Sequence, residues 1–436
     1  MNLVRIHILI LFFFNILSAQ GLRIYGTTNI YTSDAHDSFF TNNNIYDTIN
    51  TESYLSNIFN LKFQRNKFTL NTSVVNDFKN VNLHKLSFQF NYEDYGYDFG
   101  LVNIKENNWL PAKSSGHMLV SKNAAPVYGS NIFKKFNFDK LNLTFSMFNG
   151  ILSSLNLYEW NGTYIKKIPT SYPEEPYLHV KSISLRKNLK NDNFVAFVFN
   201  HGAIWGGSTK KYSEIIDWPT NFEAFQRVFF IRSGINDSTD ERHKIANHNG
   251  SFDFYLKNKK LLYYYLHYFE DGSGVKFKNN FDGLWGINYK EKKYDIIIEY
   301  LNTTHQSGNF HGKNGIGVDS YYWHDQYVQG WTVEGQLIGN HILSPDNNRI
   351  EMFLFGFNKI IKNENFSVEV KRINEFLTYG KKVLPQDFNS KKIVNKKNHL
   401  KMGYTLNFKE DVNYQINFHY LDNKSLFNFL INWNFN

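Results

Sequence analysis

The sequence predicts an all-β fold, a transmembrane antiparallel β-barrel of about 18 strands, from three observations. Aromatic residues make up 18% of the 436 residues, although the mean hydropathy is only −0.45. Apolar and polar residues alternate along many segments of roughly nine residues, the length that a tilted strand needs to cross a bilayer. Short and long connections follow one another along the chain, which indicates short periplasmic turns and long outer loops.

Composition excludes several other classes of protein. The chain has no cysteine, so it holds no disulfide framework, thiolate metal site or cysteine nucleophile. It has no apolar run of transmembrane length after residue 20, which argues against a helical membrane protein. The net charge of +9 lies partly in short runs between alternating segments, such as KNKK (257–260) and KEKK (290–293). Such runs are typical of solvated turns, and we expect no nucleic-acid partner.

The first residues of the chain predict export. Arg5 supplies a positive charge, residues 6–17 are apolar, and Ser18 and Ala19 are small residues before a cleavage point. Residues 1–19 are therefore interpreted as a signal peptide, and residues 20–436 as one outer-membrane barrel domain. A signal anchor is the alternative, but the apolar stretch is too short to span a bilayer well.

The strands follow from the alternation, which is clearest in residues 412–420. There Val412, Ile416 and Tyr420 share one face with other apolar residues, while the opposite face carries asparagine, glutamine and histidine. The expected strands are 22–31, 53–63, 66–75, 83–92, 95–104, 131–138, 141–149, 178–187, 193–200, 250–257, 261–269, 283–289, 294–302, 349–359, 365–373, 399–408, 412–420 and 425–435. Their number is even, as in single-chain bacterial barrels.

A barrel of this width encloses an aqueous lumen unless something fills it. The three longest connections, 150–177, 201–249 and 303–348, are long enough to fold inward. We therefore expect the long outer loops to occlude the lumen.

The long connections also contain the candidate binding residues. In HGAIWGG (201–207), Trp205 among three glycines is either a stacking platform for a sugar ring or a wedge against the barrel wall. In EYLNTTHQSG (299–308), the hydroxyl and amide groups either bind a polyol or connect the loop to the barrel interior. The candidates for polysaccharide binding are His201, Trp205, Asn302, Thr304, Gln306, Tyr322, Trp323 and Trp331.

Metal and catalytic sites are not expected. The string FEDGSG (269–274) suggests either a metal loop or an acidic strand end before a glycine turn, and the turn is the better interpretation. His305, His311 and His324 have no standard ligand spacing. We find no nucleophile elbow, P-loop or metalloprotease motif, so we expect neither an enzyme nor a cofactor.

Taken together, the loop strings resemble the Wzi-like capsule assembly family of outer-membrane barrels. The strings are GHMLVSKNAAPVYG (116–129), HGAIWGG (201–207), YFEDGSG (268–274), DGLWG (282–286), EYLNTTHQSG (299–308), GW (330–331) and IGN (338–340). The resemblance implies a lectin-like outer-membrane protein that binds capsular or exopolysaccharide and assists its assembly or attachment at the cell surface. The expected partners are that polysaccharide and outer-membrane lipid, and the expected state is a monomer. The alternative function is a porin-like diffusion channel for small solutes.

Overall fold

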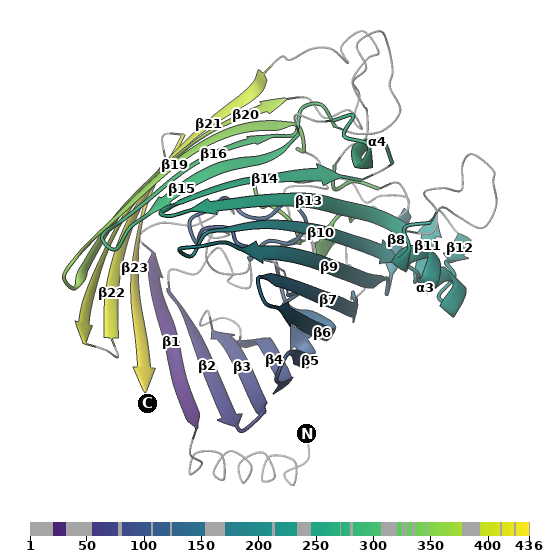
Figure 1. The fold of residues 1–436 in the computed structure, drawn as a ribbon, viewed down its shortest axis with the longest axis horizontal. Helices are drawn as coiled ribbons and strands as arrows, with labels where there is room; N and C mark the ends of the chain where they lie inside the picture. The colour runs from purple at the N-terminus through teal and green to yellow at the C-terminus, as the bar shows by residue number, and fades with distance from the viewer. Residues whose placement is uncertain are drawn as a thin grey trace.

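The chain forms a closed antiparallel barrel of 18 strands (Figure 1). The computed structural model describes residues 21–31, 55–76, 81–105, 108–122, 124–152, 171–211, 214–232, 246–270, 272–279, 282–306, 321–324, 327, 329–333, 336–345, 347–376, 393–409, 412–422 and 424–435. The predicted signal peptide lies outside these residues.

All 18 strands expected from the alternation are present. They are β1 (Leu22–Tyr31), β2 (Leu55–Arg65), β3 (Phe68–Asn76), β4 (Val81–Tyr92), β5 (Tyr95–Val102), β6 (Val127–Phe138), β7 (Leu141–Ile151), β9 (Tyr177–Asn188), β10 (Phe194–Trp205), β13 (Ala246–Asn258), β14 (Leu261–Phe269), β15 (Gly283–Lys290), β16 (Tyr294–Asn302), β19 (Ile350–Ile361), β20 (Glu364–Phe376), β21 (Ile393–Lys409), β22 (Val412–Leu421) and β23 (Lys424–Phe435). Several extend beyond the expected ends toward the long connections, because strand pairing continues there without the alternation that a bilayer requires.

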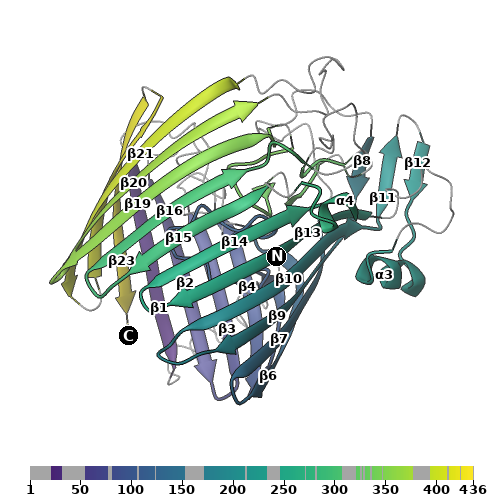
Figure 2. The same cartoon turned by 45° about the horizontal axis from the view of Figure 1, so that its top comes forward.

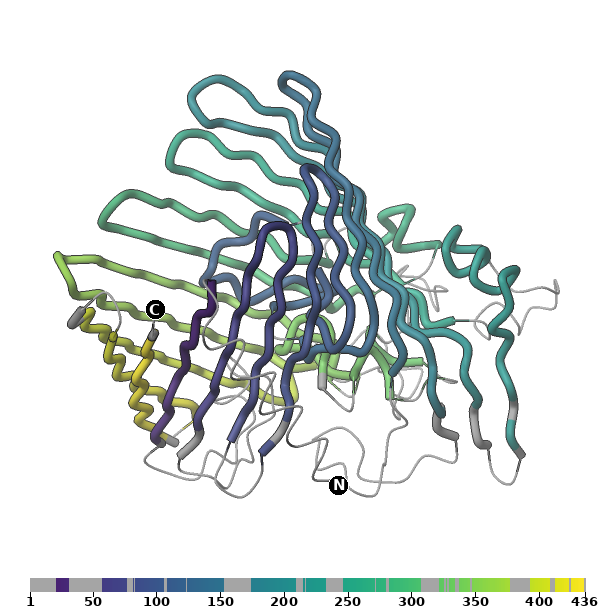
Figure 3. The backbone as a smooth tube through the Cα atoms, turned by 90° about the horizontal axis from the view of Figure 1, so that it is seen from below, coloured from purple at the N-terminus to yellow at the C-terminus, as the bar shows by residue number. Residues whose placement is uncertain are grey.

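The first and last strands close the barrel. β1 pairs with β2 on one side and with β23 on the other, in the register Ile24 to Phe435. Figure 3 shows the purple first strand beside the yellow last strands. Closure pairs both edges of the sheet, so no strand edge of the barrel remains open.

The two faces of the barrel wall differ as the alternation predicts. Phe254, Ile416 and Phe427 point outward and are 41%, 49% and 50% exposed. Asn417 and His419, on the opposite face of β22, are buried inside. An apolar outer belt is the surface that such barrels present to lipid. Among the described residues, no helix is long and apolar enough to cross a membrane.

Two segments lie inside the lumen, and we call them together the plug: the described parts of residues 103–126, between β5 and β6, and of residues 321–349. The second segment includes the small hairpin of β17 (Thr332–Val333) and β18 (Gln336–Leu337). Buried plug residues such as Met118 and Trp331 form one apolar core with inward-facing strand residues such as Leu266 and Leu301. The expected inward fold of the 303–348 loop is therefore confirmed for its described part.

The other two long connections differ from that expectation. Their described parts form a small sheet of β8 (Ser171–Glu174), β11 (Ser208–Lys211) and β12 (Glu214–Asp217), which extends past the rim with α3 (Phe222–Phe229) (Figure 2). The reason is the apolar face of α3, which packs on outward-facing residues of β9 and β10 instead of on the lumen. The segment that fills the lumen in their place is the described part of residues 103–126.

Candidate functional site

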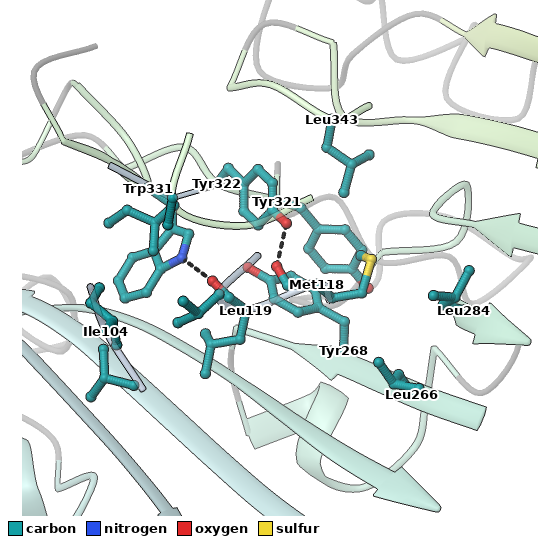
Figure 4. Close-up of a cluster of buried hydrophobic side chains, with 14 of the residues drawn as sticks. Ile104, Met118, Leu119, Leu266, Tyr268, Leu284, Tyr321, Tyr322, Trp331 and Leu343 are labelled. Atoms are coloured by element: carbon teal, nitrogen blue, oxygen red, sulfur yellow. Dashed lines mark hydrogen bonds between the residues drawn. The ribbon is translucent and has the colours of Figure 1, made fainter. Parts of the chain in front are cut away.

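The two plug segments are joined by two large side chains (Figure 4). The Trp331 indole nitrogen donates a hydrogen bond to the Leu119 carbonyl at 2.6 Å, and the Tyr322 hydroxyl donates to the Met118 carbonyl. Both side chains are fully buried. Each also requires a nearby glycine, because a Cβ at Gly202 would clash with the Trp331 ring and a Cβ at Gly339 would clash with the Tyr322 hydroxyl.

Buried carboxylates fix the plug to the barrel wall. The Glu299 carboxylate, on the inner face of β16, accepts hydrogen bonds from the Ser115 backbone nitrogen at 2.8 Å and from the Ser114 and Tyr264 hydroxyls at 2.5 Å. The three donors satisfy a carboxylate that would otherwise be costly to bury.

A second carboxylate, Asp253 on β13, contacts His117 of the plug. The Asp253 Oδ2 and His117 Nε2 atoms are 2.9 Å apart, and Asn200 donates to the same oxygen at 2.7 Å. Sequence reasoning missed both acids. The signal for Glu299 was an acid directly after the apolar run of residues 296–298, and for Asp253 it was an acid between two outward-facing phenylalanines.

A third acid, Asp282, organises the start of the 303–348 loop. Its carboxylate accepts hydrogen bonds from the backbone nitrogens of His305 at 3.0 Å and Gln306, and from the Tyr321 hydroxyl at 2.8 Å. Burial raises the pKa of Tyr321 well above its ordinary value, as it does for Tyr322, so both phenols remain protonated donors.

Two of the eight predicted binding residues, His201 and Trp205, lie on the outer face of β10 beneath α3. The Trp205 ring centroid is 5.2 Å from that of Tyr177 and 5.9 Å from that of Phe225. The His201 Nε2 atom is 3.0 Å from His248 Nδ1. Of the two interpretations of Trp205, this geometry is that of a wedge against the barrel wall.

Five more predicted residues are buried inside and bonded to the protein. Asn302 accepts hydrogen bonds from the Thr304 backbone nitrogen and hydroxyl, and Gln306 donates to Asn348 Oδ1 at 2.8 Å. Tyr322 and Trp331 make the plug contacts already described. Sugar binding by these residues stays a prediction, and the contacts give them a structural role.

Trp323 is the one residue of the eight that solvent reaches, with 40% of its surface exposed. Its neighbour Tyr322 has a backbone φ of 67° and is held at two points: its backbone nitrogen donates to Glu270, and its hydroxyl donates to the Met118 carbonyl inside the plug. A bulky residue in the left-handed region is uncommon and is held there only by firm surroundings. Trp323 is thus an exposed indole on a fixed support.

The described part of the string FEDGSG is bonded to the protein, and Asp271 lies outside the described residues. Glu270 accepts hydrogen bonds from the Tyr268 hydroxyl and the Tyr322 backbone nitrogen, and α4 (Gly272–Val275) follows it. Within the described ranges, no group of three or more histidine and carboxylate side chains has the geometry to hold a metal ion.

An 18-stranded antiparallel barrel around an internal plug defines a transmembrane-type β-barrel, and solved structures agree with this class. The fold is similar to that of Wzi from Escherichia coli, described as a carbohydrate-binding outer-membrane barrel involved in group 1 capsule assembly. The TM-score is 0.61 at 12% identity, covering 98% of this chain and 86% of that chain. At this identity the similarity establishes a Wzi-like fold. No protein-family model and no curated protein matches the sequence.

Two other barrels are less similar. A mutant porin of Rh. blastica has a TM-score of 0.38 at 8% identity and covers 95% of this chain and 99% of its own. OccD3 of Pseudomonas aeruginosa has a TM-score of 0.42 at 6% identity, covering 96% of this chain and 92% of its own.

Proposed function

We propose that this protein is an outer-membrane protein that binds capsular or exopolysaccharide and assists its assembly or attachment at the cell surface. The observation that carries the proposal is the plug. Its two segments bind each other through Trp331 and Tyr322, and they bind the wall through Glu299 and Asp253. A lumen filled in this way favours a binding protein over an open pore.

The contact that we assign to the polymer is Trp323. A sugar ring presents a face of C–H groups that packs on an exposed indole, and a rigid indole loses little conformational entropy on binding. The support comes from Tyr322, whose anchored side chain and backbone fix the position of the next residue. Five of the other candidates act, in this proposal, by shaping the loop that presents Trp323: Asn302, Thr304, Gln306, Tyr322 and Trp331. His201 and Trp205 lie on the outer face of β10 beneath α3 and have no part in sugar binding in this proposal.

The test replaces Trp323 by alanine and measures surface-bound and released polysaccharide in cells with equal levels of folded barrel. We expect weaker retention, because losing one stacking contact costs on the order of 1 kcal/mol, about a fivefold change in affinity at a single site. Repeating units in a polymer reduce the apparent effect, so the released fraction is the sensitive quantity.

The matched control is Trp285→Ala. Trp285 is 43% exposed, similar to Trp323, but it lies on the outer apolar wall of β15 and stacks on Tyr265 with ring centroids 3.8 Å apart. Its loss should leave retention unchanged. Equal retention in wild type and Trp323→Ala would contradict the assigned contact.

A diffusion channel is the second candidate, and one observation favours it. A polar cavity of about 450 Å³ lies in the lumen beside the plug, lined by amide, hydroxyl and lysine side chains. Planar-bilayer recordings distinguish the two functions, because a plugged barrel should give no stable large conductance. A steady open pore in the wild-type protein would favour the channel.

A further inference from the structure

The lumen cavity lies between the plug and one part of the barrel wall. Its lining comes from β1, β2 and β19–β23 together with plug residues 112–114, Lys122 and His341. Asn365 and Thr405, which pair across β20 and β21, lie close to the strand ends that short turns join. The cavity therefore reaches the short-turn ends of β20 and β21.

The charge of the cavity is strongly positive. Four lysines line it, Lys113 and Lys122 from the plug and Lys371 and Lys401 from the wall, against the single acid Glu369 among the described lining residues. Four positive charges and one negative charge leave a net charge of +3. His341 adds none at neutral pH, since burial lowers its pKa to about 3.

The direct hydrogen-bond acceptors of the two plug lysines are neutral, and the acids that attract these lysines from farther away are Glu369, Asp295 and Glu299. Lys113 donates hydrogen bonds to the Phe357 carbonyl at 3.3 Å and to Asn358 Oδ1 at 3.2 Å, and Lys122 donates to the Ala112 carbonyl. These acceptors satisfy the donors but carry no charge. Burial lowers the pKa of both amines, which an anion in the cavity would offset. Lys371 has an acidic partner in the lining, with its Nζ atom 2.8 Å from Glu369 Oε1, and the same carboxylate attracts Lys401.

The remaining lining groups are those that bind sugar hydroxyls. Around the lysines lie amide and hydroxyl side chains: Thr27, Asn29, Ser114, Asn358, Asn365, Ser367, Thr405, Gln415 and Asn432. Such groups both donate and accept hydrogen bonds, as a polyol requires. A volume of about 450 Å³ is within the range of roughly 300–1,000 Å³ that small-molecule sites occupy.

We propose that this cavity is a binding site for an acidic sugar unit, whose carboxylate contacts the lysines and whose hydroxyls contact the surrounding amides. Charge-assisted hydrogen bonds from several amines in a partly enclosed site favour a carboxylate over a neutral sugar. The ring of amides favours a sugar acid over a small inorganic anion. The inference does not depend on polymer binding at Trp323.

The experiment titrates the purified full-length protein in detergent with D-glucuronate, D-glucose, acetate and inorganic phosphate, using calorimetry at pH 7 and low salt. We expect saturable binding of glucuronate and weaker binding of the other three probes. Lys122→Gln and Lys401→Gln should each weaken glucuronate binding about tenfold, as expected for the loss of a charged hydrogen bond. Higher salt should weaken it as well.

Glu369→Gln should change the glucuronate affinity in the opposite direction. Removing the one lining acid releases Lys371 and should tighten glucuronate binding, an effect that general damage to the fold would not produce. Lys105→Gln is the matched control, since Lys105 is a partly exposed lysine paired with Asp98 at 3.1 Å outside this cavity. It should bind glucuronate as the wild type does.

Folding is checked by the faster gel migration of the unboiled barrel. Lys122 is exposed to the cavity, so its replacement keeps the test decisive even if Lys401→Gln does not assemble. Three results would overturn the proposal: no glucuronate binding by the wild type, unchanged binding in a folded Lys122→Gln variant, or binding of glucose, acetate or phosphate as tight as that of glucuronate.

Discussion

The inner faces of the two sides of the barrel are built differently. On β14 and β16 the inward residues Tyr264, Leu266, Ile297 and Leu301 are buried against the plug. On β20–β23 the inward residues that line the cavity are amides, hydroxyls and lysines, with one acid, Glu369, and one leucine, Leu430. We call the first side the packed wall and the second the open wall.

The difference in polarity between the two inner faces can be seen in the sequences of their strands. In β14, LLYYYLHYF, both faces of the strand are apolar or aromatic, because one side meets lipid and the other meets the plug. In β22, VNYQINFHYL, the lipid face is apolar and the inner face is polar from Asn413 to His419, with Leu421 at its end. A strand of a barrel that loses its alternation therefore indicates a filled lumen beside it.

The largest effect should come from Trp331→Ala on the plug. The substitution removes a fully buried indole and its hydrogen bond to Leu119, so the plug should lose about 3–5 kcal/mol of stability. Limited proteolysis should then cut the plug, and planar bilayers should show channel openings, while the barrel still migrates as a folded species. Trp323→Ala is the control and should do neither. If the Trp331→Ala barrel resisted protease and did not conduct, the contact between Trp331 and Leu119 would not be what holds the plug together.

A smaller effect is expected for Tyr264→Phe on the packed wall. The change removes one of three donors to the Glu299 carboxylate and should cost about 1.5–3 kcal/mol in urea unfolding. Tyr263→Phe is the matched control, because Tyr263 is the neighbouring residue and points outward, 38% exposed. Equal stability of the two variants would show that the carboxylate does not depend on the phenol.

The smallest effect is expected for two threonines, Thr303 directly after β16 of the packed wall and Thr405 on the open wall. Thr303 donates to the Asn348 carbonyl at 2.7 Å and accepts from the Ile350 nitrogen at 2.9 Å, so Thr303→Ala should cost about 1–3 kcal/mol. Thr405 lines the cavity, and Thr405→Ala should stay within about 0.5 kcal/mol. The measurement is the urea midpoint of each variant. If Thr405→Ala were as destabilising as Thr303→Ala, the distinction between packed and open walls would be lost.

The sequence predicts the barrel well because its signal is local. Each strand must present apolar residues to lipid at every second position, and this requirement acts on each segment separately. The alternation in 412–420 is therefore enough to place β22 without knowing its neighbours.

The plug and the site could be predicted only in part, because their contacts are not local. Nothing near Trp331 in the chain indicates that its partner is Leu119, 212 residues away. An aromatic residue beside glycines fits a buried contact as well as a stacking platform, so Trp205 and Trp331 could not be distinguished from Trp323 by pattern alone. The lysines of the cavity come from three separate segments, and only the fold brings Lys113, Lys122, Lys371 and Lys401 together.

The pairing of β1 with β23 has a consequence for how the protein is made. The Thr27 hydroxyl donates to Asn432 Oδ1 at 2.6 Å, a contact between residues 405 positions apart. Such long-range pairing is slow to form, because the entropy of closing the loop is lost before any contact compensates for it. The barrel cannot close until β23 has been synthesised and exported, so the edge of β1 that pairs with β23 stays unpaired until then. A chain with this topology therefore depends on chaperones that prevent its aggregation until β23 is available for pairing.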